Sequence, residues 1–178
     1  MCFSATASFG AGAILGTVGI IAIAKAKTNP QRVFATIPLI FAVQQVSEGL
    51  LWLSLKNADM ASWKTSLTYI FLVFAMAVWP FWIAFSVRLM EKDAKRKRIM
   101  NFLVAIGAVV AITVGFVLFL YPVEVMTPLC LTCPGSATPD IRNHLHYEFT
   151  FPPVAKGLIG TFTVLYIMAT IVTPFVSS

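Results

Sequence analysis

The stretch KRKRIMNFLVAIGAVVAITVGFVLFLYPV, residues 95–123, decides the fold. Four consecutive basic residues precede an apolar run, 99–123, that contains no charged side chain. A helix needs about 20 such residues to cross the roughly 30 Å hydrocarbon core of a bilayer. Lipid offers no partner to exposed backbone polar groups, and the run lacks the alternation of a β-barrel strand. The stretch therefore predicts a transmembrane α-helix.

The composition of the whole chain indicates the same class. Of its 178 residues, 58% are hydrophobic and only 11% are charged, whereas soluble domains carry about 25% charged residues. Four further apolar runs have the length of a membrane span. The five expected spans are 8–24, 33–55, 65–87, 99–123 and 157–178. We therefore expect a single domain over 1–178, an all-α polytopic transmembrane helix bundle, with the lipid bilayer as its partner.

The basic residues are distributed unevenly among the expected connections. Nine of the thirteen lie in the first and third connections: Lys25, Lys27, Arg32, Arg88, Lys92, Lys95, Arg96, Lys97 and Arg98. Cytoplasmic loops of membrane proteins are enriched in Lys and Arg, so both connections are predicted to face the cytoplasm. Five crossings then place the N-terminus and the long outer loop, 124–156, outside. The expected location is the bacterial inner membrane.

The formal net charge of +6 follows from the same enrichment. A nucleic-acid partner is not expected, because no basic face is interleaved with aromatic residues.

One carboxylate interrupts the second apolar run. Placing a charged side chain at the centre of a bilayer costs about 2.5–3.5 kcal/mol on insertion scales, so Glu48 is expected to face a cavity or a partner in the outer half of the span. Gln44 and Glu48 share a helix face, and Gln45, Glu48 and Trp52 form a stripe. Two interpretations stay open. Glu48 is either a catalytic or ligand-binding acid below an outward-facing site, or a buried carboxyl kept neutral or hydrogen-bonded for helix packing.

The outer loop gathers cysteine and histidine side chains in an otherwise apolar chain. His144 and His146 are two residues apart, so an extended segment would point both to one face. Cys130 and Cys133 lie in the same loop, and the predicted topology adds Cys2 on the same side. Thiolates and imidazoles are ligands of zinc and copper. These five residues are therefore the expected ligands of a metal site with zinc or copper.

The cysteines allow other interpretations. Outside the cytoplasm cysteines tend to form disulfides. A Cys130–Cys133 pair would form a CxxC of the kind found in thiol–disulfide oxidoreductases, whereas a bond from Cys2 to either would be a structural staple. Cys2 is also a catalytic candidate, because removal of Met1 would place its thiol beside an amine. Whether the protein is an enzyme stays open. The remaining alternative is a non-enzymatic subunit with membrane protein partners, or a homo-oligomer.

Glycines and prolines predict how the spans pack and bend. Gly12 and Gly16 have the GxxxG spacing that lets two helices approach closely. Pro80 is expected to kink the third span, and Pro38 the inner end of the second.

The opening string MCFSATASF, residues 1–9, resembles the start of a family of uncharacterised bacterial polytopic membrane proteins. QQVSEGLLW, residues 44–52, and the CLTCPG…HLHY loop are also similar to that family. Its members run somewhat longer and have further helices, so the resemblance implies a piece of a longer, seven-span protein. No activity comes with the resemblance.

Overall fold

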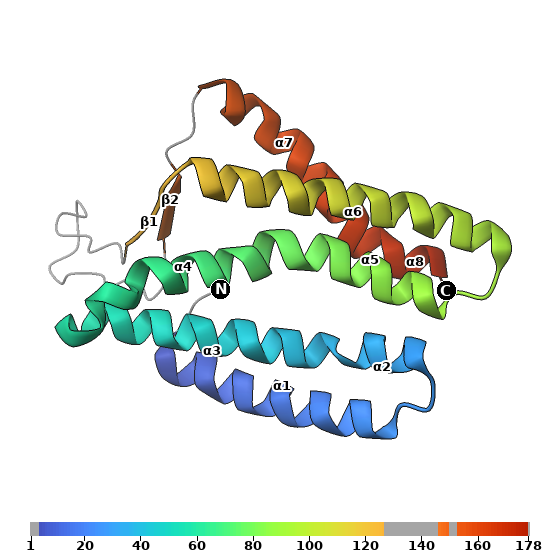
Figure 1. Cartoon of the computed structure of the whole chain (residues 1–178), viewed down its shortest axis with the longest axis horizontal. Helices are drawn as coiled ribbons and strands as arrows, with labels where there is room; N and C mark the ends of the chain where they lie inside the picture. The colour runs from blue at the N-terminus through green and yellow to red at the C-terminus, as the bar shows by residue number, and fades with distance from the viewer. Residues whose placement is uncertain (1–3, 127–145, 150–152, 178) are drawn as a thin grey trace, which may run out of the picture.

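The computed structural model describes residues 4–126, 146–149 and 153–177 (Figure 1). Within these ranges, five helical segments are long and apolar enough to cross a membrane. They are Ala5–Lys25, Asn29–Lys56, Ala58–Met90, Ala94–Leu120 and Gly160–Ser177. The expected helical architecture is confirmed at this level.

The first two segments form a close antiparallel pair. Helix α1 (Ala5–Lys25) begins after Ser4, whose Oγ accepts a hydrogen bond from the Ala7 N–H, as an N-cap residue does. The second segment comprises α2 (Asn29–Ala35) and α3 (Ile37–Lys56), separated at Thr36. Proline at position 38 offers no N–H to the carbonyl of Phe34, which accepts from the Thr36 N–H instead. The break therefore falls where Pro38 predicts one.

A stripe of glycines on α1 allows this pair to approach closely. A Cβ placed on Gly12 would lie 3.2 Å from Val46 Cγ2 and 3.4 Å from the Ala42 carbonyl oxygen. On Gly19 it would lie 2.6 Å from the Leu39 side chain. The packing predicted from the GxxxG spacing is confirmed, and the stripe continues one further turn to Gly19.

The third segment changes its helical form before its proline. It comprises the 3₁₀ turn η1 (Ala58–Trp63), α4 (Lys64–Leu72), the π-helical η2 (Val73–Val78) and α5 (Trp79–Met90). In a π-helix the N–H of residue 80 would bond to the carbonyl of residue 75, but Pro80 has no N–H. The Ala75 carbonyl accepts from the Tyr166 hydroxyl instead, at 2.9 Å. The expected perturbation at Pro80 is thus a π-helical segment in which the Tyr166 hydroxyl supplies the hydrogen bond that Pro80 cannot donate.

The fourth segment, α6 (Ala94–Leu120), ends three residues before the expected span. Tyr121 is extended, as residues before proline usually are, and Pro122 leads into strand β1 (Val123–Met126). Strand β2 (His146–Phe149) pairs with β1 in antiparallel register, with Val125 opposite Tyr147 and Met126 opposite His146. The sequence analysis had assigned no regular structure to this part of the outer loop.

The last segment comprises α7 (Pro153–Ile167), the π-helical η3 (Met168–Val172) and α8 (Thr173–Ser177). As in the third segment, the π-helical part lies just before a proline, Pro174.

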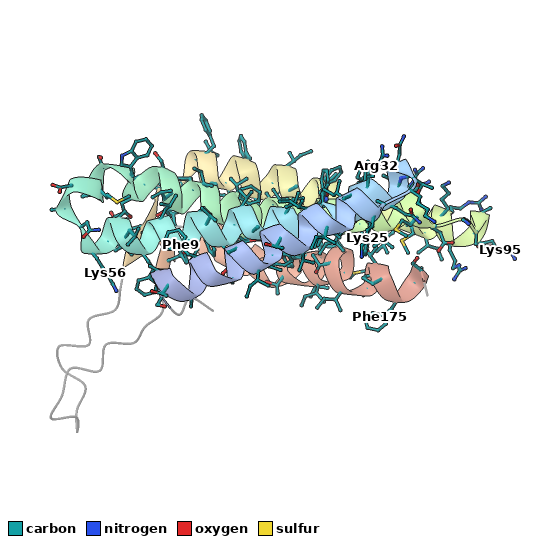
Figure 2. The ribbon with its side chains drawn as sticks, turned by 90° about the horizontal axis from the view of Figure 1, so that it is seen from below. Phe9, Lys25, Arg32, Lys56, Lys95 and Phe175 are labelled. Atoms are coloured by element: carbon teal, nitrogen blue, oxygen red, sulfur yellow. The ribbon has the colours of Figure 1, made fainter. Side chains whose placement is uncertain are left out.

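The turns divide between the two ends of the bundle (Figure 1). The hairpin and η1 lie at one end, and the α1–α2 and α5–α6 turns lie at the other. Figure 2 shows Lys25, Arg32 and Lys95 at one end and Phe9 and Lys56 at the opposite end. The two basic connections therefore share one end, which we call the basic end, and we call the other the hairpin end.

Large apolar side chains also cover the outside of the bundle. Many of the most exposed project from α1, α6 and α8: Ile14, Ile20, Phe102, Ile112, Phe116, Phe119 and Phe175. An apolar surface of this extent is typical of a protein that faces lipid.

Candidate functional site

A group of buried polar side chains lies on α3. Glu48 is only 1% exposed, and Gln44 and Ser47 are also buried. The Gln45 amide donates to Glu48 Oε2 at 3.2 Å. Among the described residues, Glu48 Oε1 has no hydrogen-bond partner. A packing hydrogen bond therefore accounts for one carboxyl oxygen, and the other is buried without a partner among the described residues.

Gln44 connects the second and third spans. Its Oε1 accepts a hydrogen bond of 2.6 Å from Trp79 Nε1, and the Trp79 ring stacks on Phe41 with centroids 3.9 Å apart. Nearer the basic end, Trp82 Nε1 donates to Thr36 Oγ1 at 3.0 Å. Two indole N–H groups therefore hold α5 against the second span. Gln45 of the predicted stripe donates to Glu48, whereas Gln44, on the other predicted face, accepts from Trp79 of the neighbouring helix α5.

The hairpin packs on α3 one turn beyond Glu48. Trp52, four residues further and roughly 6 Å along the axis, is 4% exposed and packs in one cluster with Leu51, Leu67 and Val125 of β1. In the part of the chain that the structure describes, its Nε1 has no hydrogen-bond partner. Lys56 Nζ lies 5.7 Å from the centroid of its ring. Glu48 and Trp52 thus place on one buried helix face a carboxyl oxygen and an indole N–H that have no partners among the described residues.

Segments that are distant in sequence meet at this cluster around Trp52. Ala5, at the start of α1, and Tyr147, in β2, both pack against it. The Tyr147 ring also stacks on Phe71 of α4, with centroids 5.6 Å apart and planes 8° apart. The N-terminal segment, α3, α4 and both strands therefore converge at the hairpin end.

Most of the predicted metal ligands cannot be placed. Cys2, Cys130, Cys133 and His144 lie outside the described residues. His146 is the first residue of β2, opposite Met126. Within the described ranges, no group of three or more His, Cys, Asp or Glu side chains could hold a metal ion. The five-residue ligand set, and any disulfide among the three cysteines, stay predictions.

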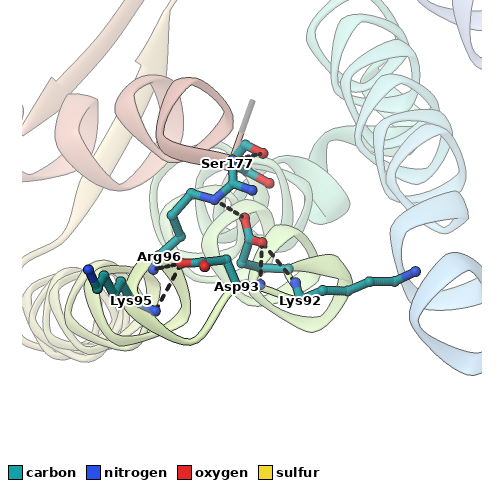
Figure 3. A network of polar contacts seen from close by, with 6 residues as sticks. Lys92, Asp93, Lys95, Arg96 and Ser177 are labelled. Carbon is teal, nitrogen blue, oxygen red and sulfur yellow. Dashed lines mark hydrogen bonds and ion pairs between the residues drawn. The ribbon is translucent and has the colours of Figure 1, made fainter.

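A polar network at the basic end was missed by the sequence analysis (Figure 3). Glu91, which is buried, accepts hydrogen bonds from the N–H groups of Lys92 at 2.8 Å and Asp93 at 2.9 Å. Its Oε2 lies 3.5 Å from Arg96 Nε, and Arg96 Nη1 donates to the Ser177 carbonyl at 3.3 Å. The network therefore joins the α5–α6 turn to the end of α8.

These contacts favour the ionised form of Glu91. The Asp93 N–H contributes most to lowering the pKa of this carboxyl, and the Lys92 N–H and the Arg96 charge act in the same direction against the opposing effect of burial. Asp93 caps α6 beside it, since its Oδ1 accepts from the N–H groups of Lys95 and Arg96, both at 2.9 Å. Asp93, an acidic residue just before α6, was the sequence signal for the helix cap. The contact with Ser177 had no such signal, because Ser177 is 81 residues from Arg96.

Comparison with protein-family models gives one match. Residues 1–127 match a model described as "Family of unknown function (DUF6629)". The chain belongs to this family. The matched region of this DUF6629 member contains Cys2 and Glu48 and ends before Cys130, so the cysteines and histidines of the outer loop lie beyond it. Searches of curated proteins and of solved structures found no significant match.

Proposed function

We propose that the protein is an integral membrane protein that binds a transition-metal ion, zinc or copper, at the hairpin end, on the extracytoplasmic side of the bacterial inner membrane. The observation that carries the proposal is the shared contact of Ala5 and Tyr147 with the cluster around Trp52. Ala5 follows Cys2 closely, and Tyr147 follows His146. Two segments that supply predicted ligands are therefore anchored at one place.

Chain length allows the remaining ligands to reach this place. A fully extended chain spans at most about 3.3–3.6 Å per residue. Cys2 and His144 are each three residues from an anchor, Ala5 or Tyr147, which limits each to roughly 10 Å from it. Cys130 follows Met126 of β1 by four residues, a reach of about 14 Å.

The chemistry of these residues suits a site of four ligands. Zinc binds thiolates at about 2.3 Å and neutral imidazoles at about 2.0–2.1 Å, so each thiol and any protonated imidazole must first lose a proton. Glu48 would lie below such a site with one carboxyl oxygen available. Cys2 and Glu48 are the residues that we propose for any catalysis, as nucleophile and as acid or base.

Membrane insertion itself is supported by two features. Five apolar helical segments have the necessary length, and the two turns that hold most of the basic residues, α1–α2 and α5–α6, lie at one end of the bundle. The enrichment of Lys and Arg in cytoplasmic loops favours the hairpin end as the extracytoplasmic one.

Metal content tests the proposal. Protein purified in detergent under anaerobic conditions should contain about one zinc or copper ion per chain by elemental mass spectrometry. His144→Ala with His146→Ala should lose the metal, whereas Asp59→Asn, a matched change in an exposed residue near the hairpin end, should retain it. Absence of stoichiometric metal in the unaltered chain would overturn the proposal.

The state of the cysteines distinguishes the alternatives. A stable bond from Cys2 to Cys130 or Cys133, found by non-reducing peptide mapping, would favour a structural staple in a membrane complex. A Cys130–Cys133 bond that exchanges with dithiol substrates would favour a thiol–disulfide oxidoreductase. Three free thiols that become protected when zinc is added would favour the metal site.

A further inference from the structure

An open depression lies at the basic end, where α1 ends and α2 begins. Its volume is about 400 Å³. Its lining comes from α1, the turn after it, α2 and the last residue of α5: Ala22, Lys25, Ala26, Lys27, Gln31, Phe34, Ala35 and Met90. It is far from the hairpin end, so it is separate from the proposed metal site (Figure 2).

The polar part of the depression is cationic. Lys25 and Lys27 are exposed, and neither forms an ion pair with any described residue. No carboxylate appears among its described lining residues. Glu91 follows Met90 directly, but its carboxylate already pairs with Arg96 and accepts two backbone hydrogen bonds. The positive charge of the two lysines is therefore not neutralised by any carboxylate of the described residues.

The turn that carries the lysines has a defined shape. Thr28 and Gln31 form a capping box at the start of α2, and Gln31 Oε1 accepts hydrogen bonds from the N–H groups of Lys27 and Thr28, at 2.9 and 3.2 Å. The backbone at Lys27 is thereby held next to α2. The Gln31 amide nitrogen is left to donate to a ligand.

The remaining wall is apolar. Phe34 is 43% exposed and Met90 is 42% exposed, and Ala22 and Ala35 lie beside them in the lining. Two unpaired cations next to an apolar wall, at the ends of membrane-length helices, match one kind of ligand. A phosphate group would face the lysines, and the first carbons of an acyl chain would cover Phe34 and Met90.

We propose that this depression binds an anionic phospholipid of the inner leaflet, with its phosphate held by Lys25 and Lys27. The proposal rests on membrane insertion, as the proposed function does, but not on metal binding. A basic residue near an anionic membrane surface contributes about a fivefold gain in affinity, so the two lysines together should contribute roughly 25-fold.

Native mass spectrometry of the full chain in detergent would test this proposal. Phosphatidylglycerol and phosphatidylcholine with identical acyl chains would be titrated separately against the protein. We expect clear preference for phosphatidylglycerol, reduced roughly 25-fold in Lys25→Gln/Lys27→Gln. The matched control is Lys95→Gln/Lys97→Gln, which removes the same charge at the same end outside the depression and should retain the preference. Equal binding of the two lipids, or an equal loss in the control, would overturn the proposal.

Two further measurements separate a lipid from a soluble phosphate. Phe34→Gln should weaken phosphatidylglycerol binding, since the acyl carbons lose their apolar contact. Inorganic phosphate or glycerol phosphate, at concentrations equal to that of the lipid, should not displace phosphatidylglycerol. Displacement at equal concentration would mean that the site takes a soluble phosphate and would contradict the lipid assignment. If the unaltered protein contained stoichiometric metal but showed no preference for phosphatidylglycerol, this proposal alone would be overturned. A preference for phosphatidylglycerol without bound metal would overturn only the proposed function.

Discussion

Replacement of Gly107 by alanine should destabilise the bundle, because α6 crosses the third span at this residue. A Cβ at position 107 would meet the carbonyl oxygen of Pro80 and lie 2.7 Å from its carbonyl carbon and 3.1 Å from Phe81 Cα. Ordinary contacts begin at 3.4 Å, so the two backbones would have to separate by about 0.7 Å or more. All three contacts are to backbone atoms, so no side chain can rotate out of the way.

Overpacking of this kind typically costs about 1–3 kcal/mol. In a chain of this size, each kcal/mol lowers the melting temperature by about 2–4 °C, so the melting temperature of Gly107→Ala should fall by about 2–12 °C. Intrinsic tryptophan fluorescence of the detergent-purified protein would measure the transition. The matched control is Gly115→Ala on the same helix, because nothing lies within 4 Å of a Cβ at that position. Alanine there should leave the melting temperature unchanged or raise it, since alanine favours the helix. Equal melting temperatures for the two variants would refute the close crossing at Gly107.

Two further predictions concern the hydrogen bonds that join the spans. Gln44→Leu removes the acceptor of the Trp79 indole and should cost about 0.6–1.7 kcal/mol, the range for hydrogen bonds between membrane helices. The control Gln45→Leu should leave the fluorescence emission of Trp79 unchanged. If Gln44→Leu also left this emission unchanged, that result would count against the hydrogen bond between Trp79 and Gln44. Because the folded-state pKa of Glu91 is lowered, its contribution to stability is fully present above the usual carboxyl pKa and is lost as pH falls through the lowered value. Glu91→Gln should therefore lower the melting temperature at pH 7. From pH 7 to acid pH, its melting temperature should fall less than that of the unaltered protein, and an equal fall in both proteins would contradict this.

The helical architecture could be predicted because each apolar run has the length that a helix needs to cross a bilayer. The runs 8–24, 33–55 and 65–87 all lie inside observed helical segments, and the GxxxG spacing identified the close pair. Successive spans run in opposite directions, so the first and third connections lie at the same end. The count of spans therefore also predicts that both basic connections share one end. These features depend on local composition and on one external length, so one sequence is enough to find them.

The features that the sequence did not reveal depend on distant partners. The strands of the hairpin are four residues long, too short for their alternation to stand out, and packing of Val125 and Tyr147 around Trp52 positions them. Pro80 predicted a disturbance, but the Ala75 carbonyl that Pro80 leaves without an N–H donor accepts from the hydroxyl of Tyr166, 91 residues from Ala75.

The candidate site was predicted in part. The spacing identified Glu48 and its stripe, and the burial of Glu48 agrees with either interpretation of it. Spacing could not assign Gln44 to Trp79 rather than to Glu48, because that choice depends on how α5 packs against α3.

X-ray absorption spectroscopy of the zinc-loaded protein tests the proposed metal site most directly. We expect one tightly bound ion with a mixed shell of sulfur at about 2.3 Å and nitrogen at about 2.0–2.1 Å. Cys130→Ser/Cys133→Ser should remove the sulfur contribution, and His144→Ala/His146→Ala should remove the nitrogen contribution. A shell made only of oxygen, or no bound ion after dialysis, would contradict a metal site at the hairpin end.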